Sequence, residues 1–277
     1  SGMDLNGKTA VVTGAANGIG AALARRFHAA GARVVVADRD AKNLTAIENE
    51  LNSVRPDSAF AVAADIGSEQ GNIDLINAAR DRFGFINLFF ANAGIASGTD
   101  LSSTDEATWD NIMNINLNAH RWAAKHLIED WLAAGEGYFC STASAAGLLS
   151  QIGSATYSVT KHAAVAFAEW MSITYGDRGV RVSCLCPQGV NTNMLNPPDR
   201  PKDPTGGIAR TGGDVVKASG DVLEPAEVAD IVYAHILEEH FLVMPHPEVH
   251  TYEKRKVEDR DRWLAGMRRL QAKVLGS

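Results

Sequence analysis

Near its start the chain has an apolar run that leads into three glycines, Ala10-Val11-Val12-Thr13-Gly14-Ala15-Ala16-Asn17-Gly18-Ile19-Gly20. The apolar run predicts a buried strand, and the helical pattern from Ile19 to Ala30 predicts a helix directly after it. Glycines at such a junction allow a tight turn, and without a Cβ they let a pyrophosphate approach the backbone and the helix N-terminus. We therefore expect a dinucleotide to bind here, held by Gly14, Asn17, Gly18, Ile19 and Gly20.

An acidic residue, Asp38, closes the second apolar run, Val34-Val35-Val36-Ala37, and lies 18 residues after Gly20. A spacing of roughly 20 residues is typical of the carboxylate that accepts hydrogen bonds from the adenosine ribose. The same carboxylate would repel a 2′-phosphate, so the sequence favours NAD over NADP. Arg39 keeps NADP open as an alternative, because its guanidinium could stack on the adenine or bind a phosphate.

The alternation of short apolar runs with helical patterns continues to residue 244. After the two strands above, apolar runs at 59–62, 86–90, 138–142, 181–185 and 241–244 alternate with helical patterns near 44–51, 73–83, 105–133, 155–175 and 225–239. Continuous apolar runs are typical of parallel strands that helices cover on both faces. The sequence predicts an α/β, doubly wound Rossmann fold with a mostly parallel seven-stranded sheet and helices on both faces. We expect one domain over residues 3–277, leaving out Ser1 and Gly2 as the remnant of a cleavage site.

Two segments interrupt or follow this pattern. Residues 195–222 are rich in Pro and Gly and show no periodicity, which favours a mobile loop over the substrate; the alternative is a featureless surface insert. From Val249 onward the tail has 8 basic and 4 acidic residues, and Trp263, Met267, Leu270 and Val274 recur at helical spacing. We expect residues 249–275 to form a helical tail that packs on its own subunit or a neighbour, with a membrane surface as the less favoured alternative.

Three further side chains form a candidate catalytic set. Tyr157 and Lys161 are four residues apart on a predicted helix and share a face, and Ser144 follows the run 138–142. An unperturbed Tyr has a pKa near 10, but the Lys161 ammonium and an oxidised nicotinamide would both favour the phenolate and lower that pKa. Ser144 could hydrogen-bond the substrate oxygen. Taken singly, each of these residues also fits an ordinary structural role.

Together with the glycine turn, these residues make the chain resemble the compact single-domain branch of the short-chain dehydrogenase/reductase (SDR) family. The matching motifs occur in the order Thr13-Gly14-x-x-x-Gly18-x-Gly20, Asn92-Ala93-Gly94, Asn116, Ser144, Tyr157, Lys161, Pro187 and Thr192. The resemblance implies that Tyr157 is the acid/base, that Lys161 also binds the nicotinamide ribose and that Asn116 anchors a water that relays the proton.

The resemblance also implies the remaining cofactor contacts. Asp65 and Ile66 would lie by the adenine, Asn92, Ala93 and Gly94 by the adenosine and ribose, and Pro187, the Val190 backbone and Thr192 by the carboxamide. A homotetramer formed through the helices at 105–133 and 155–175 is implied as well.

Two positions depart from the family's usual pattern. Ala91 stands in place of the first Asn of Asn-Asn-Ala-Gly, and Gln188 stands in place of the Gly that usually follows the proline. The longer side chain of Gln188 would lie beside the nicotinamide. There it is expected to contact substrate together with Ser144, Met194 and Leu195.

Composition excludes several other classes of protein. A net charge of −7 and a pI near 5.6 argue against a nucleic-acid partner, and no apolar run approaches the roughly 18 residues of a membrane span. The cysteines, Cys140, Cys184 and Cys186, are too few for a disulfide framework, which favours a reducing, cytoplasmic location. Cys184 and Cys186 are expected on one face of a strand, and no metal site is expected.

The prediction for function is an NAD-dependent oxidoreductase that interconverts a secondary alcohol and its ketone. One alternative is an NADP-dependent carbonyl reductase of the same fold, and another is a dinucleotide-binding sensor or scaffold without catalysis. The apolar character of Ala96, Leu148 and Met194 suggests a lipophilic alcohol, a terpenoid or a steroid, as substrate.

Overall fold

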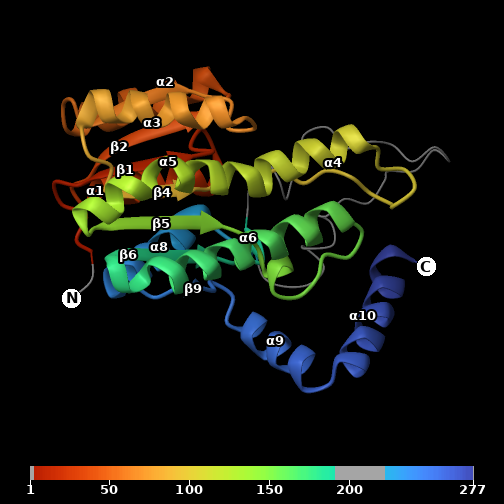
Figure 1. The fold of residues 1–277 in the computed structure, drawn as a ribbon. Coiled ribbons are helices and arrows are strands. Elements are labelled where there is room, and N and C mark those ends of the chain that lie inside the picture. The colour runs from red at the N-terminus through yellow and green to blue at the C-terminus, as the bar shows by residue number, and fades with distance from the viewer. Residues whose placement is uncertain (1–2, 191–221, 277) are drawn as a thin grey trace.

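Seven parallel strands form the central sheet of the computed structural model, which describes residues 3–190 and 222–276 (Figure 1). The strands are β1 (Thr9–Thr13), β2 (Arg33–Asp38), β3 (Ala59–Ala63), β4 (Leu88–Ala91), β5 (Gly137–Thr142), β6 (Val180–Leu185) and β9 (Leu242–Val243). Their order is β3-β2-β1-β4-β5-β6-β9, and every neighbouring pair is parallel. The chain moves outward from β1 to β3 and then returns to place β4 beside β1, so the topological switch point lies between β1 and β4.

Helices cover both faces of this sheet, as predicted. The helices α1 (Gly18–Ala29), α2 (Ala41–Val54) and α8 (Pro225–Glu238) pack against one face, and α3 (Glu69–Phe83), α5 (Ala119–Ala134) and α6 (Ala155–Tyr175) pack against the other. Successive strand residues alternate between the two cores: Val12 is buried on the α1 side and Val11 on the α3 side. The continuous apolar runs of the sequence are therefore explained by two covered faces.

The helix predicted over 105–133 has a break near its middle. It consists of α4 (Glu106–Met113), a π-helical turn at Asn114–Asn118, and α5. The side chain of Asn116, within the turn, is tied to the loop after β4. Its Oδ1 accepts a hydrogen bond from the Ile95 N–H at 2.9 Å, and its Nδ2 donates to the Ile95 carbonyl at 2.9 Å. Single π turns inside helices are frequent at functional sites.

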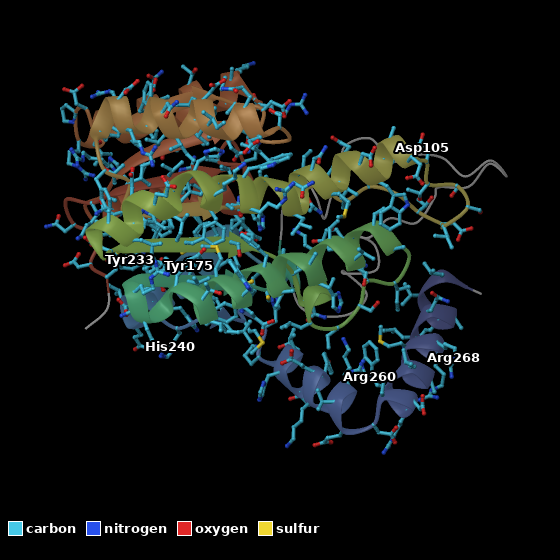
Figure 2. All side chains as sticks on the ribbon, viewed as in Figure 1. Asp105, Tyr175, Tyr233, His240, Arg260 and Arg268 are labelled. Atoms are coloured by element: carbon cyan, nitrogen blue, oxygen red, sulfur yellow. The ribbon has the colours of Figure 1, made fainter. Side chains whose placement is uncertain are left out.

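The tail forms two helices, α9 (Glu248–Glu258) and α10 (Arg260–Leu275), which extend away from the sheet (Figure 1). Asp259 separates them and caps α10 by accepting a hydrogen bond from the Arg262 N–H at 3.1 Å. A small apolar cluster joins α10 to Ile152; its α10 members are Met267, Leu270, Val274 and Leu275. The exposed Arg260 and Arg268 lie on the same helix (Figure 2).

The tail is also fixed to the loop that follows Ser144. The Lys256 ammonium donates to the carbonyls of Leu148 and Leu149 at 2.9 and 3.1 Å. The tail thus contacts the rest of the same chain through these hydrogen bonds and through the Ile152 cluster.

Several predictions fall on residues that the structure does not describe. These are residues 195–221 of the predicted substrate loop, and the predicted contacts of Thr192, Met194 and Leu195. On either side of this gap, β7 (Gly189–Val190) and β8 (Val222–Leu223) pair as a second, two-stranded parallel sheet. Within residues 3–190 and 222–276, no helix has an apolar stretch long enough to span a bilayer.

Candidate active site

The glycine turn between β1 and α1 has a backbone that requires glycine. Gly14 and Gly18 have φ values of +62° and +56°, in the left-handed region that side chains disfavour. A Cβ at Gly14 would lie 2.8 Å from the Ala93 Cα, and a Cβ at Gly20 would overlap the Gly14 carbonyl. The first turn of α1 contains no acidic residue, so its N–H groups and dipole favour an anion. This cradle fits the pyrophosphate of a dinucleotide.

Asn92 holds the glycine turn against the sheet. Its Nδ2 donates to the Thr13 carbonyl at 3.2 Å, and its N–H donates to the Thr13 hydroxyl at 2.9 Å. The Thr142 hydroxyl, at the end of β5, donates to the Asn92 Oδ1 at 2.7 Å. These bonds join the ends of β1, β4 and β5. The contribution of Thr142 was not predicted, because a hydroxyl at the end of a strand has no sequence signature of its own.

The Asp38 carboxylate faces the glycine turn. It accepts hydrogen bonds from the N–H groups of Ala16 and Asp40, each at 3.1 Å, and the side chain of Arg39 is exposed. After β3, Ile66 is buried, and the exposed Asp65 accepts a hydrogen bond from the Gly67 N–H at 3.0 Å. One side of the glycine turn therefore carries an acidic side chain.

Ser144, Tyr157 and Lys161 meet beyond the carboxyl end of β5. The Ser144 hydroxyl hydrogen-bonds the Tyr157 side chain and accepts from the Ala146 N–H at 3.0 Å. Ser154 caps α6 by accepting the Tyr157 N–H at 3.3 Å, which fixes Tyr157 in the first turn of that helix. Lys161 follows one turn later, with its Nζ 5.3 Å from the centroid of the Tyr157 ring. The fold thus brings together the three residues that the spacing selected.

The pKa values of this set differ from what the sequence suggested. Burial raises the pKa of Tyr157 above its ordinary value, and the Ser144 hydrogen bond opposes that rise only in part. Lys161 is 2% exposed, and burial lowers its pKa to about 8, with the nearby Cys184 and Cys186 acting in the opposite direction. The predicted lowering of the Tyr157 pKa is therefore not met by this chain alone, because desolvation outweighs the hydrogen bond with Ser144.

Asn116 lies next to Lys161. A Cβ at Gly94 would be 3.2 Å from the Lys161 Nζ and 3.4 Å from the Asn116 Oδ1, so these three residues adjoin. The Asn116 Nδ2 also donates to the Thr160 hydroxyl at 3.2 Å, a contact that the sequence did not suggest. The amide is thus held on both sides, by the β4 loop and by α6.

Beyond β6 the chain hydrogen-bonds to His246, a contact that the sequence did not suggest. The Pro187 carbonyl accepts from the Ala145 N–H at 2.9 Å, and the Gln188 N–H donates to the Nδ1 of His246 at 3.0 Å. Val190 is placed by its backbone in β7. Among the described residues no group of three possible ligands could hold a metal ion.

Two buried thiols lie near the end of β6: Cys184 is within the strand, and Cys186 follows its last residue. The sulfur atoms of Cys184 and Cys186 are 3.9 Å apart, as expected for side chains on one face of a strand. All three cysteines of the chain are free thiols.

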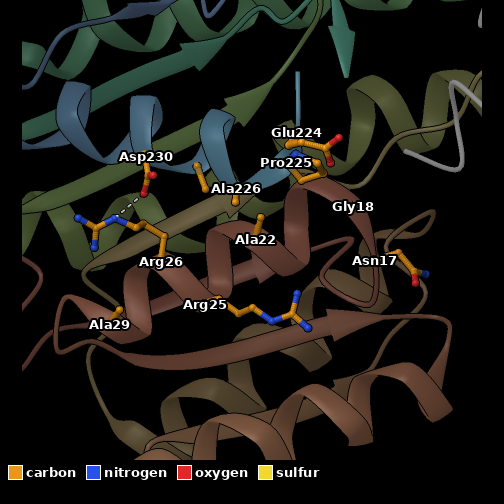
Figure 3. Close-up of a pocket in the computed structure, with 11 residues that line it drawn as sticks. Asn17, Gly18, Ala22, Arg25, Arg26, Ala29, Glu224, Pro225, Ala226 and Asp230 are labelled. Carbon is orange, nitrogen blue, oxygen red and sulfur yellow. Dashed lines mark ion pairs between the residues drawn. The ribbon is translucent and has the colours of Figure 1, made fainter. Parts of the chain in front are cut away.

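A groove of about 600 Å³ lies between α1 and α8 (Figure 3). Asn17 and Gly18 line one end of it, so it borders the glycine turn from outside. Its two arginines are already paired: Arg26 with Asp230 at 3.0 Å, and Arg25 with Glu50 at 2.8 Å. None of the candidate catalytic residues lines this groove. It is therefore separate from the site formed by Ser144, Tyr157 and Lys161.

The chain is similar to known proteins in both sequence and fold. A family profile described as short chain dehydrogenase matches residues 8–203. The 3beta-hydroxysteroid dehydrogenase 2 of Eggerthella lenta is 31% identical over 192 residues, 69% of this chain and 74% of that protein. The meso-2,3-butanediol dehydrogenase of Serratia marcescens is 33% identical over 194 residues, 70% of this chain and 76% of that protein.

Among solved structures, a short chain dehydrogenase/reductase from Burkholderia phymatum in complex with NAD has a TM-score of 0.83 to this fold. It is 26% identical in sequence, and the match covers 94% of this chain and 96% of that one. The segment matched by the family profile contains the glycine turn and all four candidate catalytic residues.

Proposed function

Because this chain belongs to the short-chain dehydrogenase/reductase family of oxidoreductases, we propose that it interconverts a secondary alcohol and its ketone with NAD. The observation that carries the proposal is the meeting of Ser144, Tyr157, Lys161 and Asn116 beside the glycine turn. A dinucleotide-binding scaffold has no need of such an acid/base set, which weighs against that alternative.

The residues around the site fit a nicotinamide dinucleotide. The glycine turn and the N-terminus of α1 would hold the pyrophosphate, Asp38 the adenosine ribose, and Lys161 the nicotinamide ribose. Asp65 and Ile66 would lie by the adenine, Asn92, Ala93 and Gly94 by the adenosine and ribose, and Pro187, the Val190 backbone and Thr192 by the carboxamide. When bound, the nicotinamide supplies the hydride acceptor or donor.

The protein's own side chains would move the proton. During oxidation Ser144 holds the substrate oxygen near Tyr157, and the Tyr157 phenolate takes the hydroxyl proton. Because burial raises the pKa of Tyr157 in the protein alone, phenolate formation needs the cations of Lys161 and of the oxidised nicotinamide. From Tyr157 the proton passes towards Lys161 and a water beside Asn116. A screen of secondary alcohols with NAD, followed by NADH absorbance, tests this function directly.

For the substrate we infer a lipophilic secondary alcohol of the terpenoid or steroid class. Leu148, in the loop between Ser144 and Tyr157, is partly buried and packs against the apolar core. The Eggerthella lenta relative is by its name a hydroxysteroid dehydrogenase, which supports including steroids among the first alcohols to be screened. Ser144 and Gln188, with Met194 and Leu195, are the proposed substrate contacts.

The preference for NAD depends on Asp38. The change Asp38→Asn removes the negative charge that would repel a 2′-phosphate, so we expect the NAD/NADP affinity ratio to fall by about 10-fold or more. Calorimetric titration of both cofactors measures this ratio. Asp81→Asn is the matched control, because it removes the same charge from an exposed position on α3 and should leave the affinities for both cofactors unchanged. Tighter binding of NADP than NAD by the unaltered protein would contradict the proposal and favour the NADP-dependent reductase.

We propose that the protein is a homo-oligomer, a tetramer, formed partly through α6. Its outer face carries Val159, Trp170 and Ile173, and the last two are 52% and 84% exposed. Apolar side chains at helical spacing on an exposed face are typical of a surface that another subunit covers.

Replacing both Trp170 and Ile173 by Glu is expected to shift the protein from tetramer towards monomer, because charges would be buried without partners. Light scattering coupled to size exclusion measures the mass. Val54→Glu is the control, since Val54 is 74% exposed on α2 and should leave the mass unchanged. If the double variant had the same mass as the unaltered protein, α6 would not be part of the subunit interface.

Two broader proposals complete this picture. Residues 3–277 form one domain, which is supported by two cores that share the same strands. The location is cytoplasmic, which is supported by the three free thiols.

A further inference from the structure

The imidazole of His246 is buried at the sheet edge that carries the catalytic residues, and only part of its hydrogen-bonding capacity is used. The residue is 2% exposed, and its Nδ1 accepts the Gln188 N–H at 3.0 Å. Its Nε2 is buried and has no hydrogen-bond partner among the described residues. Buried polar atoms without a partner are uncommon in native proteins, so this one calls for an explanation.

The Gln188 contact determines which ring nitrogen carries the proton. An atom that accepts a hydrogen bond from a backbone N–H presents its lone pair, so the proton of the neutral imidazole is assigned to Nε2. The two ring nitrogens point in divergent directions, and Nε2–H therefore points away from the Gln188 peptide. The Nε2–H of His246 is therefore a buried hydrogen-bond donor that lacks an acceptor among the described residues.

The position of His246 in the fold indicates which molecule could supply the acceptor for its Nε2–H. Strands β5, β6 and β9 are neighbours in the sheet, and Ser144, Gln188 and His246 each follow the carboxyl end of one of them within three residues. The three loops are in contact, because the Ala145 N–H donates to the Pro187 carbonyl and the Gln188 N–H donates to His246. Ligands of open parallel sheets bind beyond the carboxyl ends of the strands. His246 thus belongs to the substrate side of the site, next to the loop of Ser144.

We propose that His246 binds substrate, donating a hydrogen bond from Nε2 to an oxygen other than the one that reacts. The proposal rests on the function inferred above. It assigns the preferred substrate to alcohols or ketones with a second oxygen, such as diols, hydroxyketones and diketones. Ser144 and Tyr157 bind the reacting oxygen, and His246 binds the second one.

Two variants separate this role from simple support of the loop. In His246→Asn the side-chain amide reaches the place of Nδ1 and accepts the Gln188 N–H, but no donor remains at the place of Nε2. In His246→Gln the longer side chain returns an amide donor to the place of Nε2. His250→Asn is the matched control, because His250 is exposed on α9 and should change nothing.

The test compares butane-2,3-diol with butan-2-ol on the full-length protein loaded with NADH. Calorimetry measures the Kd of each alcohol, and kcat/KM is measured where turnover occurs. We expect the unaltered protein to bind the diol more tightly, and His246→Asn to weaken diol binding about 10- to 100-fold. Binding of butan-2-ol and of NADH should stay within twofold, and His246→Gln should recover part of the loss.

Three results would overturn the proposal. The unaltered protein could show no preference for the diol, or His246→Asn could weaken both alcohols equally, or it could weaken NADH, which would assign the donor to the nicotinamide carboxamide. Failure of the proposed function has a different signature, since the unaltered protein would then oxidise no secondary alcohol while the binding comparison could still be made.

Discussion

The variant Tyr157→Phe should lower kcat for alcohol oxidation by about 10²- to 10⁴-fold, the usual contribution of a general acid or base. Phe keeps the ring that lies 5.3 Å from the Lys161 Nζ and keeps its burial, so only the hydroxyl that bonds Ser144 is lost. Affinity for NAD should therefore change by less than about threefold. Stopped-flow measurement of NADH formation, together with a fluorescence titration of NADH, separates the two quantities.

The control for this experiment lies on the same helix. Tyr175, at the other end of α6, packs edge-on against Trp170 at a centroid distance of 5.6 Å, away from the site (Figure 2). Tyr175→Phe keeps that ring contact and should retain full turnover. If Tyr157→Phe turned over as fast as Tyr175→Phe, another group would have to be the acid/base.

The variant Lys161→Met should have two effects of opposite sign. Activity should fall by about 10²-fold or more, because the phenolate of Tyr157 loses its neighbouring cation. Stability should rise, because burial lowers the pKa of Lys161 to about 8 in the folded protein, whereas the unfolded chain has the ordinary value of 10.5. At pH 7 this difference corresponds to an upper limit of about 3 kcal/mol in the free energy of unfolding.

The pH dependence of the free energy of unfolding tests whether the buried charge of Lys161 causes this gain in stability. Below pH 8 Lys161 is protonated in both the folded and the unfolded protein, and the free-energy cost of burying its charge is fully present. Between pH 8 and about 10.5 the unfolded chain binds more protons than the folded one, so unaltered protein gains stability as the pH rises. The advantage of Lys161→Met should therefore shrink from pH 7 to pH 10 in urea unfolding of the cofactor-free protein.

A surface lysine provides the comparison. Lys125 is 61% exposed and pairs with Glu69 at 2.8 Å, so Lys125→Met should change stability by less than about 1 kcal/mol and leave activity intact. A Lys161→Met protein less stable than the unaltered one at pH 7 would show that the ammonium stabilises the fold.

Local patterns in the sequence were sufficient for the architecture. Each apolar run became a strand, and the helix predicted over 155–175 has those same bounds in the structure. The glycine turn could be predicted as well, since left-handed φ angles and close backbone approach leave glycine as the residue that fits at Gly14. In these cases the information lies in neighbouring residues, which share an element and its periodicity.

Where the predictions were incomplete, distant parts of the chain were involved. The π turn in the helix predicted over 105–133 accompanies the bonds of Asn116 to Ile95, 21 residues away. The raised pKa of Tyr157 reflects burial by several elements, and burial is a property of the packed fold.

The sequence by itself determined the fold class, the glycine turn and the Ser-Tyr-Lys spacing, because helix and strand periodicity and glycine backbone geometry are local. Only the tertiary structure decided the direction in which burial shifts the pKa values of Tyr157 and Lys161, and the pairing of Gln188 with His246, which are 58 residues apart. Such contacts depend on the order in which strands lie in the sheet, here β5, β6 and β9 side by side. No single segment of the chain specifies that order.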